Sequence, residues 1–514
     1  MPKTNRPNVI IFMMDTQGVR NMSCYGYRRP TTPNIDRLAR EGALFVNHFV
    51  TAPWTLPVHA SLFTGRYESG HGAGGQHEIL EPGLPNMGEA FGRAGYRSVA
   101  LCNNGWAYND QGGCTGFDEH IRYGRDDVAP VAPYIPSDDP DLRDTGSLKA
   151  VGVSLKWIDE HRARRPSTPF LMFINCTEPH DPYRPPEPFR SRFLLEGVKY
   201  SPETVWCGGG QCFSTAGAVC PTLDEWFIQR SLVDGATACL DDRIGKLANE
   251  LAQRGVLDDT IFIVTGDHGD ITGERTHYSY HSQNGVWDWV CHTPLVIRYP
   301  KAFKAGTRCK QIVQCNDVLP ALMQLCGVRD KALEASMQGE NLLKALKGPI
   351  HDFALLEAQR AIHPMRRAWF ECGHPEDIDV RYMNVSYKAA RTKRYKYIWV
   401  SDGNDMLFDI VKDPDERWNI IKRYPEIAKK LMKAMEKKLM GIEQRYFQDA
   451  FKAGTQNWHY QMRRLAAWGF FQPGIVPPFD PKNEAEHQKN FKESLKHRPD
   501  FAPPLSMLKK IGKI

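Results

Sequence analysis

The sequence lacks the features that mark several classes of protein. None of its apolar runs approaches the roughly 18 residues needed to cross a bilayer. Lys and Arg (66) exceed Asp and Glu (60) by only 6, so no excess of positive charge points to nucleic acid. It contains no internal repeat and no low-complexity tract, which argues against a solenoid or a disordered chain. We therefore predict neither a membrane segment nor a specific nucleic-acid partner.

Secretion and zinc-ribbon signals are absent as well. Residues 1–7 contain no apolar h-region and no small-residue cleavage site, so we predict a cytoplasmic protein without a signal peptide. The 13 cysteines include no Cys-x-x-Cys pair, and Cys207, Cys212 and Cys220 do not have zinc-ribbon spacing. We interpret the cysteines as reduced thiols, and a disulfide or redox role for these three stays open.

What the chain does contain is typical of a globular enzyme. Its 514 residues are 41% hydrophobic and 25% charged, which fits two or three domains or one large α/β domain with an appendage. Apolar runs alternate with helical patterns bounded by Pro and Gly. We predict strands at residues 8–14, 98–102, 169–175, 260–265 and 293–298, and helices within 32–42, 55–65, 84–94, 147–163 and 222–254. Residues 45–51 read as a connection back to the sheet.

This alternation predicts a doubly wound, mostly parallel α/β sheet sandwiched by helices. The pattern changes after about residue 355, where residues 382–388 and 395–400 indicate a hairpin and 425–445 a Lys-rich helix. We therefore predict a catalytic domain at 1–354, a small α+β subdomain at 355–445 and an extended arm at 446–514. The arm is rich in Pro and aromatic residues, so we expect it to mediate a homo-oligomer contact.

Reactive side chains occur where strands end. Asp15 follows the first strand, Asp267 and His268 follow the strand at 260–265, and Thr55 begins a helix. Functional groups gather at the carboxyl ends of strands in open α/β sheets. Two carboxylates, an imidazole and a hydroxyl can bind one divalent metal, although each Asp taken alone is as consistent with a helix cap.

Short motifs follow one another along roughly residues 7–420. They are Pro7–Asp15, Cys24–Tyr27, Thr32–Asp36, Thr55–Gly65, Gly95–Tyr96, Gly116–Asp118, Pro179–Tyr183, Thr265–Gly269, Thr293–Leu295 and Leu407–Glu416. In these motifs and their order the chain resembles the alkaline phosphatase superfamily, in its sulfatase-like branch.

Some positions depart from the family pattern. Sulfatases have a Cys or Ser, oxidised to formylglycine, in a Cys/Ser-x-Pro-x-Arg motif; here Thr55 takes the first position and His59 the Arg position. Threonine carries a methyl group on Cβ, so its oxidation cannot give the aldehyde. Thr16 replaces the second of two acidic residues, and the family's Gly-Lys-Trp-His segment corresponds to Asn103-Asn104-Gly105-Trp106. With these departures, the site is more similar to that of the phosphodiesterases and transferases of the superfamily that use a threonine nucleophile.

The resemblance implies a set of roles for individual residues. Asp15, Thr55, Asp267 and His268 would bind one divalent metal, Mn or Zn before Ca, with a second metal left open. His180 and His281 would serve the leaving group, and His59 would support Thr55. Asn103, Asn104 and His277 would bind the substrate, which we expect to be a small anionic ester. Several of these histidines are also consistent with ordinary loop or helix positions.

The sequence therefore favours a metal-dependent hydrolase of phosphodiesters or phosphonate monoesters that works through a covalent Thr55 intermediate. Coordination to a metal would acidify the threonine hydroxyl, which is otherwise a poor nucleophile. The alternatives are a sulfuric ester hydrolase without formylglycine, a phosphoryl transferase, and a catalytically silent scaffold. The joint presence of Asp15, Thr55, Asp267 and His268 argues against the scaffold, which has no need of them.

Overall fold

The computed structural model describes residues 6–75, 80, 83–104, 106–107, 114–123, 146–180, 183–194, 222–273, 285–360 and 385–444. All of them belong to one compact unit made of residues 1–365 and 378–444. A second unit comprises residues 366–377 and 445–514, which lie outside the described part of the chain. The predicted arm at 446–514 and its oligomer contact therefore stay predictions, as do the domain boundaries.

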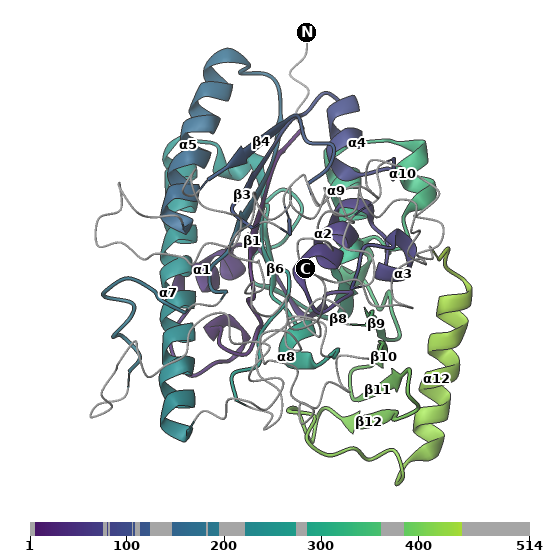
Figure 1. Cartoon of the computed structure of the whole chain (residues 1–514). Helices are drawn as coiled ribbons and strands as arrows, with labels where there is room; N and C mark the ends of the chain where they lie inside the picture. Colours follow the sequence, from purple (N-terminus) through teal and green to yellow (C-terminus); the bar gives the residue numbers. More distant parts are fainter. Residues whose placement is uncertain are drawn as a thin grey trace, which may run out of the picture. The chain divides into compact units, whose positions relative to one another are not determined.

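The main element is an eight-stranded sheet with the order β4-β3-β5-β1-β6-β7-β2-β8 (Figure 1). Its strands are β1 (Asn8–Met14), β2 (Ala43–Phe49), β3 (Arg97–Cys102), β4 (Glu119–Arg122), β5 (Phe170–Cys176), β6 (Thr260–Gly266), β7 (Leu295–Arg298) and β8 (Thr307–Gln314). β4, β3, β5, β1 and β6 pair in parallel, whereas β7 is antiparallel to both β6 and β2. Because β7 is antiparallel to both of its neighbours, β2 runs in the same direction as β6. The strands β4, β3, β5, β1, β6 and β2 therefore all end at one edge of the sheet.

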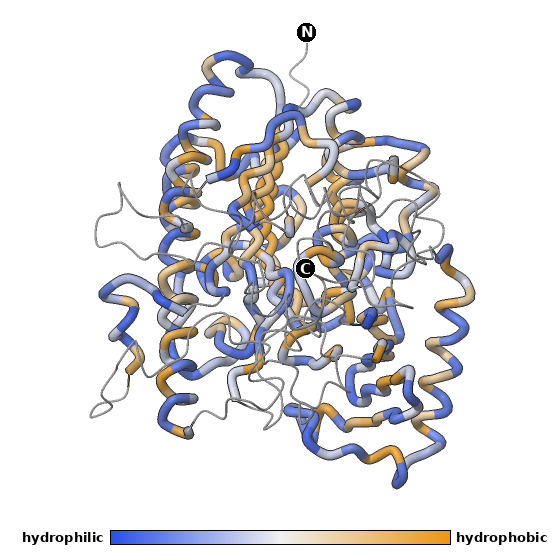
Figure 2. The backbone as a smooth tube through the Cα atoms, in the orientation of Figure 1, coloured by the Kyte–Doolittle hydropathy of each residue, from blue (hydrophilic) through white to orange (hydrophobic). Residues whose placement is uncertain are grey.

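Helices cover both faces of this sheet. Figure 1 shows α1 (Pro33–Glu41), α5 (Ser147–Arg164) and α7 (Leu223–Gln253) on one side, and α2 (Thr55–Thr64), α4 (Met87–Arg93) and α9 (Val318–Cys326) on the other. The odd-numbered side chains of β1 pack with α2, α4 and α9, and the even-numbered ones with α1, α5 and α7. Both faces of β1 are thus buried, which explains its unbroken apolar sequence (Figure 2).

The remaining short elements are α3 (Glu68–His71), α8 (Asp288–Cys291) and α10 (Lys331–Ser336), with 3₁₀ turns at Ser23–Tyr25, Leu257–Asp259, Cys315–Asp317 and Leu342–Leu346. No helix in the described ranges combines the length and apolar character that a bilayer crossing requires.

A second, four-stranded antiparallel sheet follows the main one in sequence. It contains β9 (Ala354–Ala358), β10 (Tyr387–Arg391), β11 (Tyr395–Val400) and β12 (Met406–Asp409), in the order β12-β11-β10-β9. One face packs against α12 (Pro425–Met440), and the other packs against residues near α2 and α8, including Val58 and Trp287. The small sheet therefore lies between α12 and the segment that contains α2.

The predicted fold class is confirmed, but several elements differ. The segment at 45–51, expected as a connection, is strand β2, and β8, β12 and α9 had no counterpart among the predicted elements. β2 was obscured because Asn47 and His48 interrupt its apolar pattern. Asn47 donates to Lys310 O, and the buried His48 ring forms hydrogen bonds with Thr293. The hairpin is shifted, since its first strand begins at Tyr387, and α12 ends at Met440, before the predicted end at residue 445.

Candidate active site

The site lies at the edge where the parallel strands end. Asp15 directly follows β1 and Asp267 directly follows β6, and the two strands are hydrogen-bonded neighbours. The backbone N–H of Asp15 donates to Cys176 O at the end of β5 (2.9 Å). Strand register alone therefore brings together two carboxyl groups that are 252 positions apart in the sequence.

Thr55 reaches the same edge on the first residue of α2. All ten residues of this helix are buried, and Trp54 at the N-cap supplies no side-chain hydrogen bond to the first turn. Thr55 Oγ1 lies 3.3 Å from His268 Nε2. The first backbone N–H groups of a helix have no intrahelical partner and carry partial positive charge. The structure thus places the threonine hydroxyl and an anion-binding helix terminus beside the two carboxylates.

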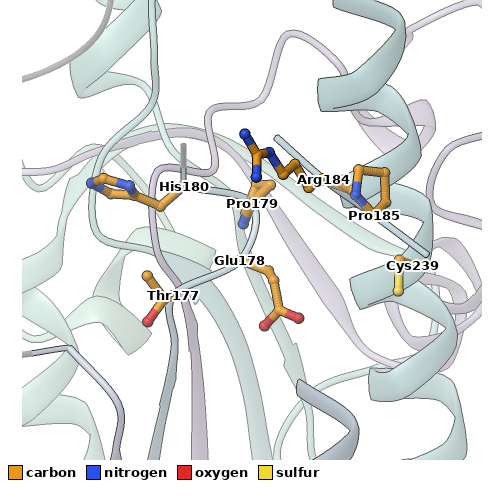
Figure 3. Close-up of a pocket in the computed structure, with 8 residues that line it drawn as sticks. Thr177, Glu178, Pro179, His180, Arg184, Pro185 and Cys239 are labelled. Carbon is orange, nitrogen blue, oxygen red and sulfur yellow. The ribbon is translucent and has the colours of Figure 1, made fainter. Parts of the chain in front are cut away.

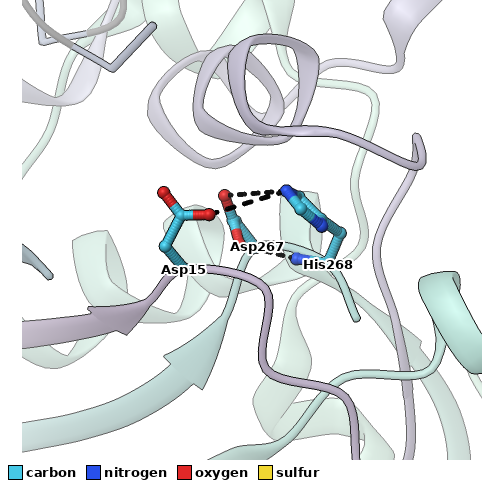
Figure 4. Close-up of side chains that lie close together, drawn as sticks. All are labelled: Asp15, Asp267 and His268. Atoms are coloured by element: carbon cyan, nitrogen blue, oxygen red, sulfur yellow. Dashed lines mark hydrogen bonds and ion pairs between the residues drawn. The ribbon is translucent and has the colours of Figure 1, made fainter. Parts of the chain in front are cut away.

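Three of the four metal ligands predicted from the sequence form one buried cluster. One possible ligand atom from each of Asp15, Asp267 and His268 lies within 4.8 Å of those from the other two (Figure 4). His268 Nε2 is 3.7 Å from Asp15 Oδ1 and 3.5 Å from Asp267 Oδ2. All three side chains are 0% exposed.

The electrostatics of this cluster call for a cation. Burial, followed by repulsion from Asp267, raises the pKa of Asp15. Burial likewise raises the pKa of Asp267 to about 6, although hydrogen bonds from the Thr16 and His268 backbone N–H groups oppose the shift. Two neighbouring carboxyl groups that are buried away from solvent are costly to ionise together, and a bound divalent cation offsets that cost.

The hydrogen bonds also fit a metal ion. His268 Nδ1 lies 3.0 Å from Gly269 O, so it carries the proton and donates to that carbonyl. Nε2 then faces both carboxylates, which is the usual arrangement of a metal-binding histidine held by a backbone carbonyl. Asp267 Oδ2 is buried and has no hydrogen-bond partner among the described residues. The donor set therefore fits a divalent cation bound between the three side chains.

Thr16 connects the two carboxylates, a role that the sequence did not indicate. Its N–H donates to Asp267 Oδ1 (3.0 Å), and its hydroxyl donates to Asp15 Oδ1 (3.0 Å). Its φ of 64° lies in the left-handed region, which is rare for a β-branched residue. This strained backbone conformation directs the N–H group of Thr16 at the cluster. Its position directly after Asp15 was the one signal that could have suggested this role.

The two candidate substrate-binding asparagines both have partners inside the protein. Asn103 Oδ1 accepts hydrogen bonds from Thr177 N (3.0 Å) and Thr177 Oγ1 (2.6 Å), which ties the end of β3 to the end of β5. Asn104 Nδ2 donates to Asp15 Oδ2, and its Oδ1 accepts from Trp106 N (2.8 Å). Asn104 thus orients Asp15, one of the predicted metal ligands, and its direct contact with substrate stays a prediction.

His59 lies one turn after Thr55, and its ring contacts the Thr55 backbone instead of the Thr55 hydroxyl. Nδ1 lies 2.7 Å from Thr55 O, and Asn175 Nδ2 donates to Nε2 across 3.3 Å. Both bonds fix a neutral ring, and burial lowers the pKa of His59 to about 4. This geometry makes His59 a positioning residue for Thr55. Its partner Asn175 was missed from sequence, although it lies at a strand end.

His180 lies on the loop after β5, where its backbone N–H donates to Thr177 O (2.8 Å). It lines a small, open pocket between this loop and α7 (Figure 3). Its charge interacts with those of Asp15 and Asp267. His277 and His281, the other two predicted histidines, lie outside the described residues, as do Cys207, Cys212 and Cys220.

Comparison with known proteins identifies the family of this chain. The model of the sulfatase family matches residues 7–328, which carry every described residue of the cluster. The chain belongs to the sulfatase family. A second family model, described as the C-terminal part of N-sulphoglucosamine sulphohydrolase, matches residues 276–445. The protein is accordingly a sulfatase-like ester hydrolase, and its family implies a divalent metal.

Named relatives are distant but match over most of their length. An ulvan-active sulfatase of Formosa agariphila is 26% identical over 434 residues, covering 81% of this chain and 77% of its own. An arylsulfatase of Clostridium perfringens is 23% identical over 492 residues, with 86% and 96% covered.

Solved structures show the same fold. A phosphonate monoester hydrolase of Agrobacterium radiobacter superposes with a TM-score of 0.65 at 20% identity, covering 85% of this chain and 96% of its own. A structure described as a complex with its substrate D-glucosamine-2-N,6-O-disulfate gives a TM-score of 0.66 at 20% identity, with 88% and 99% covered. The fold is therefore shared by proteins named for sulfur and for phosphorus esters.

Proposed function

We propose that this protein hydrolyses phosphate diesters or phosphonate monoesters through a covalent intermediate on Thr55. The observation that carries the proposal is the threonine itself, at the N-terminus of α2 with its hydroxyl 3.3 Å from His268 Nε2. A hydroxyl at this place can attack an ester whose anionic oxygens are held by the helix terminus.

Phosphorus is favoured over sulfur by the chemistry of the intermediate. A formylglycine hydrate carries two hydroxyls on one carbon, so it expels sulfate by collapsing to the aldehyde. Thr55 has one hydroxyl and a methyl group on Cβ, so a sulfated threonine would require direct attack of water at sulfur. A phosphorylated threonine is resolved by in-line attack of water at phosphorus, which mainly requires positioning and charge neutralisation.

The described residues can perform both halves of this reaction. Thr55 gives up its hydroxyl proton to solvent, Oγ1 bonds to phosphorus, and the bond from phosphorus to the alcohol oxygen breaks. His180 donates a proton to that leaving oxygen. Water then attacks phosphorus, the bond to Oγ1 breaks, and Thr55 takes up a proton. His59 and Asn175 hold the first turn of α2 in place during both steps.

The metal would be held by Asp15, Asp267 and His268. When bound, it supplies positive charge against the phosphoryl oxygens and acidifies the Thr55 hydroxyl. We propose Mn or Zn, because an imidazole nitrogen suits these borderline cations better than it suits Ca or Mg. The absence of a carboxylate at Thr16 leaves the described cluster with two acidic groups, which one divalent cation balances.

The second candidate is hydrolysis of sulfate esters. It is supported by the names of the relatives, an ulvan-active sulfatase and an arylsulfatase, and by the match to the sulfatase family. Thr55 would then attack sulfur directly, or would position a water molecule for that attack.

A comparison of rates on one leaving group separates the two candidates. Three substrates with a p-nitrophenyl leaving group are assayed: a phosphate diester, a phosphonate monoester and a sulfate ester. Mn, Zn, Ca and Mg are added in turn. We expect faster turnover of the phosphorus esters, loss of at least about 10³-fold in Thr55→Ala, and partial activity in Thr55→Ser, which retains a hydroxyl. Faster sulfate turnover would replace the first candidate with the second, and an active Thr55→Ala protein would exclude the covalent intermediate.

A further inference from the structure

The pocket beside His180 contains a positive charge that the proposed reaction does not use. Arg184 lines this pocket together with His180, and Figure 3 shows its guanidinium beside Pro179. The side chain is exposed and forms no ion pair with any residue that the structure describes. A guanidinium in this position is available to an anion from outside the protein.

The carboxylate that also lines the pocket does not neutralise Arg184. Glu178 Oε1 accepts hydrogen bonds from Ser147 N and Ser147 Oγ, both at 3.1 Å, in the first turn of α5. Its charge is thus directed at a helix N-terminus, where it is favourable. In Figure 3 the Glu178 carboxylate points away from Arg184.

The backbone around Arg184 is held firmly on both sides. Tyr183 is buried, and its hydroxyl donates to Asp270 two residues after His268. Pro185 is buried as well, and its carbonyl accepts from Arg190 Nε (3.0 Å). Gly235 of α7 lets this loop approach the helix, since a Cβ there would lie 2.4 Å from Phe189 O. Arg184 is therefore an exposed charge on a fixed support.

We propose that Arg184 binds a second anionic group on the substrate, carried by the alcohol half of the ester. The substrate class is then an ester of an alcohol that itself bears a carboxylate or another oxyanion. This inference rests on the proposed cleavage of an ester at Thr55, with His180 at the leaving oxygen. His180 and Arg184 are four residues apart, so their Cα atoms lie within about 14 Å, which one small molecule can span.

The test uses two aryl esters that differ in one charge. The 4-carboxyphenyl monoester of phenylphosphonic acid carries the second anion, and the 4-carbamoylphenyl monoester of the same acid is its counterpart of similar size without that charge. We expect Arg184→Gln to raise KM for the carboxyphenyl ester about tenfold and to leave the carbamoyl ester within about twofold. Arg192→Gln, an exposed arginine on the same loop, is the matched control and should change neither value. Equal effects on both esters, or none, would overturn the proposal.

Failure of this inference can be told apart from failure of the proposed function. If the phosphonates are inert and the corresponding aryl sulfates react, the phosphorus preference is wrong and the same comparison is made with the sulfate pair. Calorimetric binding of both phosphonates to Thr55→Ala, with and without Arg184→Gln, gives a reading that does not depend on turnover. Tighter binding of the carboxyphenyl ester that disappears with Arg184 supports the proposal, and equal binding contradicts it.

Discussion

Two buried clusters of charge in this protein have opposite balances. Asp15 and Asp267 lie at the sheet edge, and their neighbour is His268, a side chain that can be neutral. Asp288 of α8 is instead paired with two cations of the small sheet: Arg391 Nη2 and Lys396 Nζ each lie 2.8 Å from it, and Lys396 also lies 2.8 Å from Glu416. The second cluster contains its own counter-ions, whereas the carboxylates of the first have no Lys or Arg ion partner among the described residues.

The pKa values follow this difference. Burial opposes ionisation of Asp288, but Arg391 and Lys396 together hold its pKa well below the usual range. Burial raises the pKa of Asp267 to about 6, and the attraction of His180 and the hydrogen bonds at this carboxylate oppose the shift without reversing it. The two clusters also hold the non-glycine residues of positive φ in the described chain, Thr16 and Glu416. Strain therefore marks both clusters, and charge balance distinguishes the proposed metal site from the structural one.

The largest effect should come from Asp267→Asn. Asn keeps an oxygen to accept from Thr16 N and His268 N, but it removes the charge that holds the cation. We expect loss of most bound metal and at least about 10³-fold in turnover. In the presence of chelator the variant should be at least as thermostable as the parent, because repulsion with Asp15 is gone. Normal metal content, measured by atomic emission, would contradict the assignment.

Asp288→Asn should have the opposite profile. It leaves Lys396 and Arg391 buried with one negative partner removed, so the free energy of unfolding should fall by about 3–5 kcal/mol. Bound metal per folded protein should stay at the parent level. Urea denaturation and metal analysis of the same samples measure both quantities. Loss of metal without loss of stability would remove the distinction between the clusters.

The stability difference between the parent and Asp288→Asn should depend on pH. The folded-state pKa of Asp288 is depressed, so its stabilising contribution is present above the unfolded value of about 4 and is lost as the pH falls through the folded value. The stability gap between the parent and Asp288→Asn should therefore stay constant from pH 8 to about pH 5. It should narrow below about pH 4. A gap that changed between pH 5 and pH 8 would show that another group controls it.

A smaller effect is expected at His59, which supports the site without joining either cluster. His59→Leu removes the bonds to Thr55 O and Asn175, so kcat should fall about tenfold with unchanged metal content. The pH profile should keep its shape, since the His59 pKa of about 4 leaves the ring neutral throughout the assay.

His180→Gln is the contrasting variant, because it should remove the loss of activity at high pH that follows deprotonation of a general acid.

The smallest effect should come from Thr16→Gly. Glycine adopts the φ of 64° without strain but lacks the hydroxyl that donates to Asp15. We expect metal affinity to fall about tenfold, as for other outer partners of metal ligands, while the free energy of unfolding changes by less than about 1 kcal/mol. Calorimetric metal titration and urea denaturation test the two parts. An unchanged affinity would show that the backbone N–H alone positions the carboxylates.

Sequence reasoning succeeded where local pattern and strand ends carry the information. β1, β5 and β6 are buried on both faces, so their apolar runs were recognisable, and the residues after them include Asp15 and Asp267. β2 was missed because polar Asn47 and His48 interrupt it. The roles of Thr16 and Asn175 could not be predicted, since each depends on a partner from a distant strand.

The sequence by itself determined the fold class, the family and the chemical types at the site, because these depend on residue identity and on periodicity along the chain. Tertiary structure decided which of those residues act together. It placed Asn104 on Asp15, turned His59 to the Thr55 backbone, and left Arg184 exposed beside His180. The physical reason is that hydrogen-bond direction, desolvation and charge balance are set by neighbours in space, and these come from strands and loops far apart in the chain.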